Sequence, residues 1–197
     1  MEGAPAIVEY SPHKIVELTN EYLERQFGKE FRITIETKLD PLKISAIQLI
    51  DTKNFRKELR YSVEEFIERT KQPDFFCLLI YNQDLLVAFL FGYRDESLDG
   101  AFYLDTIASI LQRKGIGTLL LHCACVICYL MGFEYMTLRT ELKDEKGQHP
   151  FEFFKKNGFH RIECPPEEGI AMKKEFTEND VTTYLDMLKN KKSLKIE

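Results

Sequence analysis

The sequence predicts an α/β (α+β) protein in which strands and helices alternate along the chain. Two apolar runs, residues 75–81 and 85–93, are separated by the short polar turn Asn82-Gln83-Asp84, which is the pattern of a β-hairpin. A third strand-like run, residues 101–110, leads into a long apolar helical run at residues 119–131. A hairpin followed by a strand and a helix is the basis of this class assignment.

The N-terminal elements are predicted from caps and periodicity. Ser11 and Pro12 supply an N-cap and a first-turn proline, so we expect a helix over residues 12–27 that Gly28 ends. Apolar and polar residues alternate over residues 31–37, as they do in a strand.

The next segment is ambiguous. Residues 44–50 fit a strand or a short helix, and the placement of Ala46, Gln48 and Ile50 on one side favours the strand. Farther on, a serine followed three residues later by glutamate forms a capping box, which predicts a helix over residues 62–70.

The C-terminal half continues the alternation. We expect a strand at 133–142, a short helix at 150–157, strands at 159–163 and 169–176, and a closing helix at 179–190. The last seven residues are expected to be solvated and frayed.

Composition limits the class of protein. The chain has 197 residues, 44% apolar and 30% charged, which suits one soluble globular domain. A formal net charge of −5 argues against a general nucleic-acid binder. No apolar run reaches the roughly 18 residues that span a bilayer, and residues 1–5 lack a secretory pattern. We therefore expect no nucleic acid and no membrane, and the oligomeric state stays open.

The cysteines indicate a reducing compartment, which we take to be the cytoplasm. Their number, five, is odd, and Cys123, Cys125 and Cys128 fall in one helical run. On a helix, positions two apart point about 200° apart, so Cys123 and Cys125 cannot converge on one ion. We expect these thiols to pack in the core and the protein to use no metal.

The most informative stretch is a basic, glycine-containing turn before the long helix. It consists of Gln112, Arg113, Lys114, Gly115, Ile116, Gly117 and Thr118. The first N–H groups of a helix lack partners and carry partial positive charge, and glycine lets a phosphate approach the backbone. Arg113 and Lys114 add charge at the same place. This pattern predicts a diphosphate cradle.

Two common phosphate motifs do not fit the turn. A dinucleotide fingerprint needs a third glycine where this chain has Leu120, and the Gly-Lys-Ser/Thr of a nucleoside-triphosphate loop is absent. The order of strand, Gln-Arg-Lys-Gly-Ile-Gly and helix instead resembles the signature of the GNAT superfamily of acyl-CoA N-acyltransferases. A second segment, residues 151–159, resembles the family's aromatic-x-x-x-Gly-Phe motif.

The resemblance covers residues 44–176 and implies the GNAT fold. That fold has a mixed, mostly antiparallel central sheet with helices on both faces. Residues 1–40 would then be an N-terminal helical extension, and residues 177–197 a C-terminal helix and tail, all within one domain. The implied cosubstrate is acetyl-CoA.

The resemblance also assigns binding residues. The backbone amides of residues 112–118 would hold the pyrophosphate of the coenzyme. By position, Ile107 would pair with the thioester and pantetheine amides, as would Ser109. Phe154 stands where many members have the tyrosine that acts as general acid, and it would line the coenzyme without donating a proton.

Acid–base candidates come from the strands beside the turn. Asp105 is the first choice for general base, because aspartate is depleted from strand interiors and needs a reason to be there. Alternation puts it on one face with Tyr103 and Ile107. A carboxylate that faces solvent or pairs with a cation is the competing interpretation. Glu141 is a second candidate base, and Tyr103 or Tyr61 could replace the missing acid.

The acceptor is the least specified part. Residues 51–66 weakly resemble the acceptor-side segment of ribosomal-protein N-terminal acetyltransferases, which favours a protein N-terminus or lysine. A small-molecule acetyltransferase of the polyamine or aminoglycoside type is an alternative. So is a non-catalytic acyl-CoA sensor, because Phe154 replaces the usual acid.

Overall fold

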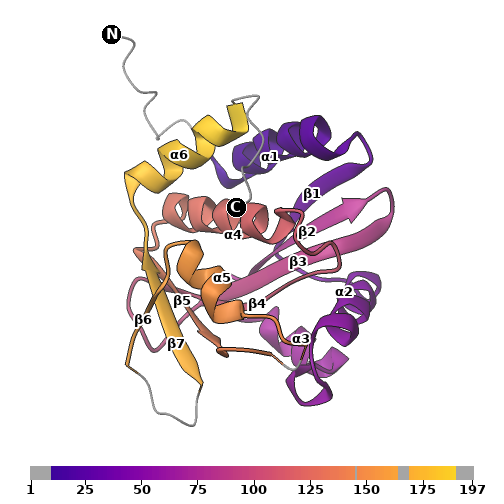
Figure 1. Cartoon of the computed structure of the whole chain (residues 1–197), viewed down its shortest axis with the longest axis vertical. Coiled ribbons are helices and arrows are strands. Elements are labelled where there is room, and N and C mark those ends of the chain that lie inside the picture. The colour runs from indigo at the N-terminus through magenta and orange to yellow at the C-terminus, as the bar shows by residue number, and fades with distance from the viewer. Residues whose placement is uncertain (1–9, 145, 164–168, 190–197) are drawn as a thin grey trace.

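The computed structural model describes residues 10–144, 146–163 and 169–189. Its centre is a seven-stranded sheet in the order β1-β2-β3-β4-β5-β7-β6 (Figure 1). The strands are β1 (Phe31–Glu36), β2 (Phe76–Asn82), β3 (Leu85–Arg94), β4 (Ala101–Ser109), β5 (Tyr135–Thr140), β6 (His160–Arg161) and β7 (Ile170–Glu175). β4 and β5 are parallel, and the other neighbours are antiparallel. The predicted mixed, mostly antiparallel sheet is confirmed.

Helices cover both faces of the sheet. The α-helices are α1 (Pro12–Phe27), α2 (Pro41–Asn54), α3 (Val63–Arg69), α4 (Ile116–Leu130), α5 (Pro150–Lys156) and α6 (Glu178–Lys189), with a short 3-10 turn at Lys57–Leu59. α1, α4 and α6 lie together over one face, and α2 and α3 lie on the other (Figure 1). Of the helices in the described ranges, none is long and apolar enough to cross a bilayer.

Local signals set most helix boundaries. Ser11 Oγ accepts from the Lys14 N–H at 3.2 Å and caps α1, and Ser62 with Glu65 completes the predicted capping box of α3. At α6, Thr177 Oγ1 accepts from the Asp180 N–H at 3.1 Å. The expected frayed tail lies outside the described residues. Apart from residues 44–50, the order of the described helices and strands matches the sequence prediction.

The strand favoured for residues 44–50 was wrong. This segment belongs to α2, which Asp40 caps and Pro41 opens. Ile44, Ile47 and Ile50 are buried, three residues apart, which is a helical stripe.

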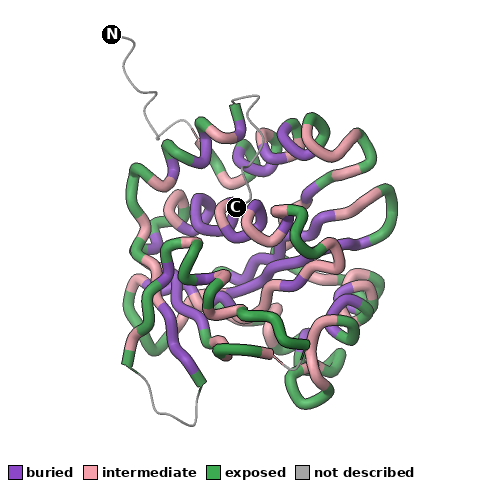
Figure 2. Tube along the Cα trace, in the orientation of Figure 1, coloured by how far each residue is buried: buried purple, intermediate pink, exposed green. Residues whose placement is uncertain are grey.

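Two apolar cores lie on the two faces of the sheet (Figure 2). The α4 core contains the inward faces of α1, α4 and α6, and the α3 core contains those of α2 and α3. β1 pairs with β2 at the sheet edge, and α1 packs in the α4 core, so residues 12–36 share the sheet and the core with the rest of the domain. The α3 core is smaller and leaves that side of β4 accessible to polar side chains.

Candidate functional site

β4 and β5 separate along their length and leave one edge of β4 open. They pair only between residues 101–103 and 135–137, after which β5 continues beside β7. The N–H of Ile110 donates to a β3 carbonyl at 2.9 Å, and in an antiparallel pair the direction of the backbone groups alternates along the strand. The backbone groups of Ile107 and Ser109 therefore face the open edge.

The turn between β4 and α4 presents a row of backbone N–H groups. Gly115 is the N-cap of α4 at a φ of +78°, without a side-chain cap. Among the described residues, no hydrogen-bond partner is found for the N–H groups of residues 115–118. The side chains of Gln112, Arg113 and Lys114 are exposed beside this row. Unpartnered N–H groups at a helix start with adjacent cations can bind an anion.

The remaining cradle residues anchor this turn. Ile116 is buried in the α4 core, and Thr118 is half-buried in the first turn of α4. A β-carbon added to Gly117 would meet the ring of Phe153 at 3.6 Å, which is ordinary contact. Packing therefore does not require glycine at this position.

The short helix α5 turns Phe153, rather than Phe154, toward the turn. Phe154 is 7% exposed and packs edge-to-face against Phe153 and Phe159, with ring centroids at 5.1 and 5.6 Å. Phe153 is half-buried, and its ring edge lies next to Gly117. The family resemblance had placed Phe154, not Phe153, beside the coenzyme.

Asp105 is held by groups from three other parts of the chain. Its Oδ1 accepts from the Tyr61 hydroxyl at 2.7 Å, and its Oδ2 accepts from the Tyr93 hydroxyl at 2.8 Å. Arg69 Nε lies 3.4 Å from Oδ2, and Thr106 Oγ1 donates to Oδ1 at 3.1 Å. The carboxylate side chain is only 2% exposed. It is thus neither solvent-facing nor free to meet an incoming amine directly.

A β-bulge places Asp105 in this network. The register between β3 and β4 shifts, so that Phe91 pairs with Thr106 while Gly92 pairs with Leu104, and Asp105 is the extra residue. The bulge breaks the alternation assumed from the sequence. Ile107 packs against the α4 core, whereas Asp105 faces the α3 side, so the expectation that they share a face was wrong.

The phenols around Asp105 are held in their neutral form. Burial, followed by the charge of Asp105, raises the pKa of Tyr61 and of Tyr93 well above the ordinary value. Arg69 lies over both rings, at 5.2 and 5.9 Å from their centroids. Sequence reasoning named Tyr61 only as a guess and missed Tyr93 and Arg69. The one sign of this network in the sequence was Asp105 itself, because an aspartate inside a strand needs hydrogen-bond or ionic partners.

Tyr103 lies on the same face as Tyr93, with ring centroids 5.7 Å apart. Burial first, and then Asp105, raise its pKa. Among the described residues, no hydrogen bond engages its hydroxyl. Unlike Phe154, Tyr103 therefore retains a proton that it can donate.

Glu141 follows β5 and pairs with an arginine from the opposite loop. Arg56 Nη2 donates to Glu141 Oε1 at 2.8 Å, and both side chains are more than a third exposed. Lys146 Nζ also reaches the backbone oxygen of Lys53. These contacts join the segment after β5 to the last turn of α2 and to the residues that follow it. Glu141 is accessible to solvent, but its carboxylate already pairs with Arg56.

The clustered cysteines pack in the α4 core. Cys123, Cys125 and Cys128 are free and buried, and burial raises the pKa of Cys123 to about 11 and that of Cys125 to about 12. Within the described ranges, no group of histidine, cysteine or carboxylate side chains could hold a metal ion. Such protonated thiols are poor nucleophiles and poor metal ligands.

The separated parallel strands, the bulged β4 and the glycine turn opening α4 together define the GNAT fold. Comparison with solved structures agrees. The chain resembles the ribosomal-protein-S18-alanine N-acetyltransferase of Escherichia coli at a TM-score of 0.57 and 16% identity, covering 74% of this chain and 94% of that one. It also resembles the PaiA N-acetyltransferase of Thermoplasma acidophilum in complex with coenzyme A (TM-score 0.56, 18% identity, 73% and 99% covered).

A third similar structure is the aminoglycoside 6'-N-acetyltransferase of Enterococcus faecium, at a TM-score of 0.61 and 19% identity, covering 73% of this chain and 96% of that one. No protein-family model matches the sequence, and no curated protein matches it. At these identities the likeness shows the fold.

Proposed function

We propose that this protein is an N-acetyltransferase that moves the acetyl group of acetyl-CoA to a primary amine by direct attack in a ternary complex. The observation that carries the proposal is the junction of the open β4 edge with the row of unpartnered N–H groups at the start of α4. An extended amide-containing chain that ends in a diphosphate complements both parts.

The cosubstrate contacts follow from this junction. The backbone of Ile107 and Ser109 pairs with the pantetheine amides, and the N–H groups of residues 112–118 hold the diphosphate. Arg113 and Lys114 add charge, and the ring of Phe153 covers the first turn of α4. Phe154 supports Phe153 from within the core.

The proton of the amine must leave before attack, because an alkylamine with a pKa near 10.4 is charged at neutral pH. Asp105 is the proposed base, and it acts through a hydroxyl. A phenol that donates to a carboxylate becomes a better acceptor at its own oxygen, so Tyr61 or Tyr93 can relay the proton. Glu141 is the second candidate base. Tyr103 is the proposed donor to the departing thiolate, because its phenol is protonated at neutral pH and its hydroxyl makes no hydrogen bond to another described residue.

The acceptor is a protein N-terminus or lysine, or alternatively a small polyamine or aminoglycoside. The resemblance over residues 51–66 favours the first class, and the proteins of similar fold include both kinds. The free buried thiols support a cytoplasmic location. A non-catalytic acyl-CoA sensor is the competing function.

Release of free CoA thiol tests the proposal. Acetyl-CoA is mixed with the protein and with a panel of peptides, polyamines and aminoglycosides, with the Asp105→Asn variant in parallel. We expect amine-dependent thiol release that the variant loses. Tight CoA binding without turnover on any amine would favour the sensor and reject the enzyme.

A further inference from the structure

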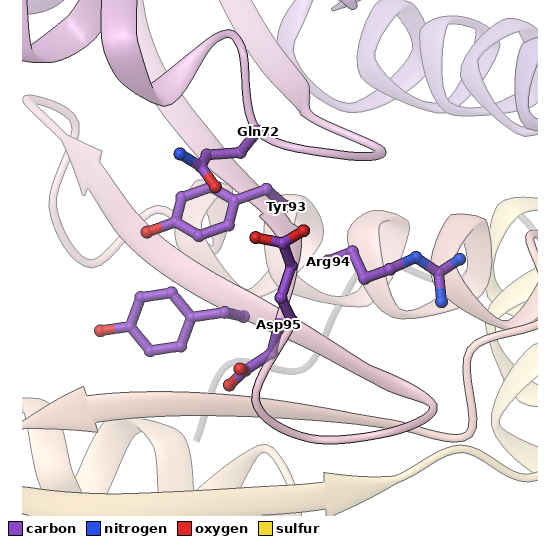
Figure 3. A pocket seen from close by; sticks show the side chains of 6 residues that line it. Gln72, Tyr93, Arg94 and Asp95 are labelled. Carbon is purple, nitrogen blue, oxygen red and sulfur yellow. The ribbon is translucent and has the colours of Figure 1, made fainter.

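A hollow on the α3 side of the sheet lies beside the Asp105 network. It has a volume of about 210 Å³ and is lined by Gln72, Tyr93, Arg94, Asp95, Glu96 and Tyr103 (Figure 3). At roughly 30 Å³ per water molecule, this volume corresponds to about seven waters, which leaves room for a short alkylammonium arm. A wider hollow of about 710 Å³, bordered by His13, Lys38 and Met131, contains no residue of the cradle or of the Asp105 network.

Tyr93 connects this hollow to the proposed reaction centre. Its side chain lines the hollow, and its hydroxyl donates to Asp105 Oδ2 at 2.8 Å. Tyr103, the proposed proton donor, forms the neighbouring wall. A ligand in the hollow would therefore lie one aromatic ring away from Asp105.

The lining is rich in hydrogen-bond acceptors. Arg94, its cation, points away from Tyr93 (Figure 3), donates from Nε to Asp74 Oδ2 at 2.6 Å, and lies 4.6 Å from the ring centroid of Phe133. The other charged groups in the lining are the carboxylates of Asp95 and Glu96. Asp95 Oδ1 accepts hydrogen bonds from the backbone N–H and the hydroxyl of Ser97. Glu96 is exposed and makes no ion pair with another described residue.

Cations on neighbouring elements do not cancel this charge. Arg69 is paired with Asp105. The charge of Arg139 on β5 lowers the pKa of the Tyr103 hydroxyl, but the charge of Asp105 raises this pKa by more. Two aromatic faces with nearby carboxylates, in a lining whose one cation, Arg94, is paired with Asp74, are the chemistry that binds an alkylammonium group.

We propose that this hollow binds the second ammonium group of a diamine or polyamine acceptor, while the first amine is acetylated beside Asp105. This proposal rests on the proposed function and selects its alternative acceptor, a small molecule with two separated amines, over a protein N-terminus or lysine. The carboxylates of Asp95 and Glu96 and the faces of Tyr93 and Tyr103 hold the distal cation. The proximal amine then lies one alkyl chain away, at the open edge of β4.

Two probes of matched shape test the proposal: 1,4-diaminobutane and butylamine, which lacks the second amine. We expect kcat/KM to be about tenfold higher for the diamine, because its distal ammonium contacts two aromatic faces beside two carboxylates. Glu96→Gln should reduce this ratio, and Asp95→Asn with Glu96→Gln should bring it near one. The matched control, Glu17→Gln with Asp84→Asn, removes two exposed charges from α1 and from the β2–β3 turn, which do not line the hollow, and should keep the wild-type ratio. Equal values for the two amines, or a peptide N-terminus preferred over the diamine in every variant, would overturn the proposal.

Calorimetric binding separates this inference from the proposed function. In the presence of CoA, 1,4-diaminobutane should bind more tightly than butylamine, and the double substitution in the hollow should abolish the difference. If this holds without any turnover, the ammonium site stands and the enzyme is rejected. If turnover occurs with other amines but the diamine binds no better, the ammonium site is rejected and the enzyme stands.

Discussion

The hydroxyl of Tyr61 donates a 2.7 Å hydrogen bond to Asp105, which is 44 residues away in the sequence. Tyr61 belongs to the segment between α2 and α3, and Asp105 is the bulged residue of β4. This bond joins the segment between α2 and α3 to the strand whose edge is open. The chemistry proposed for Asp105 therefore depends on a residue that approaches from outside the sheet.

Replacement of Asp105 tests its role as a base. Asp105→Asn should retain CoA binding and lower the rate by roughly 10²–10⁴-fold, the usual size of a general-base contribution. The loss should shrink as pH rises, because more of the amine is then already neutral. Tyr61→Phe, which removes one relay hydroxyl, should show a smaller loss with the same pH trend. A pH–rate profile for each variant measures this, and a near-wild-type rate for Asp105→Asn at neutral pH would make Asp105 structural.

Asp51 gives a pH-dependent stability. This α2 residue is 1% exposed, with one carboxylate oxygen unpartnered, and burial raises its pKa from 3.8 to about 6. The folded protein binds a proton at Asp51 more readily than the unfolded chain does. The ionised carboxylate therefore lowers the free energy of unfolding by its full amount above about pH 6, and this loss fades toward pH 3.8. Relative to Asp51→Asn, the wild type should gain up to about 3 kcal/mol of unfolding free energy between pH 8 and pH 4. Urea unfolding that gave parallel pH curves would contradict this assignment.

Phe154→Tyr restores the residue that many GNAT members use as acid, yet we expect no gain in rate. The side chain is buried against Phe153 and Phe159, so the new hydroxyl would lack a partner and cost about 1–3 kcal/mol of stability. Thermal unfolding and steady-state rates measure both effects. Tyr103→Phe is the comparison, since it should lower kcat. A faster Phe154→Tyr enzyme would show that this position reaches the thiolate.

Glu141 is expected to matter less than Asp105. Its pair with Arg56 is more than a third exposed on both sides, so a double-mutant cycle with Arg56→Ala and Glu141→Ala should give a coupling of about 0–1 kcal/mol. Glu141→Gln should lower kcat less than Asp105→Asn does. The reverse order of the two rates would transfer the role of base to Glu141.

Local patterns predicted the order of elements along most of the chain, the hairpin, the capped helices and the glycine turn before α4. α2 was missed because Ala46, Gln48 and Ile50 imitate a strand face, while the buried positions are three residues apart. The bulge at Asp105 could not be predicted, since its register depends on β3 rather than on the sequence of β4. The partners of Asp105 come from three separate elements, and only the folded chain brings them together.

CoA titration by calorimetry tests the central claim most directly, with wild type, Gly117→Glu and Gly117→Gln compared. An added β-carbon makes only ordinary contacts at this position, so both variants should fold. Gln and Glu fill the same volume, and only Glu repels the diphosphate. We expect CoA to bind the wild type, more weakly the Gln variant, and the Glu variant at least tenfold more weakly still, which corresponds to about 1.4 kcal/mol. Equal CoA affinity for wild type and a folded Gly117→Glu variant would contradict the diphosphate site at the start of α4.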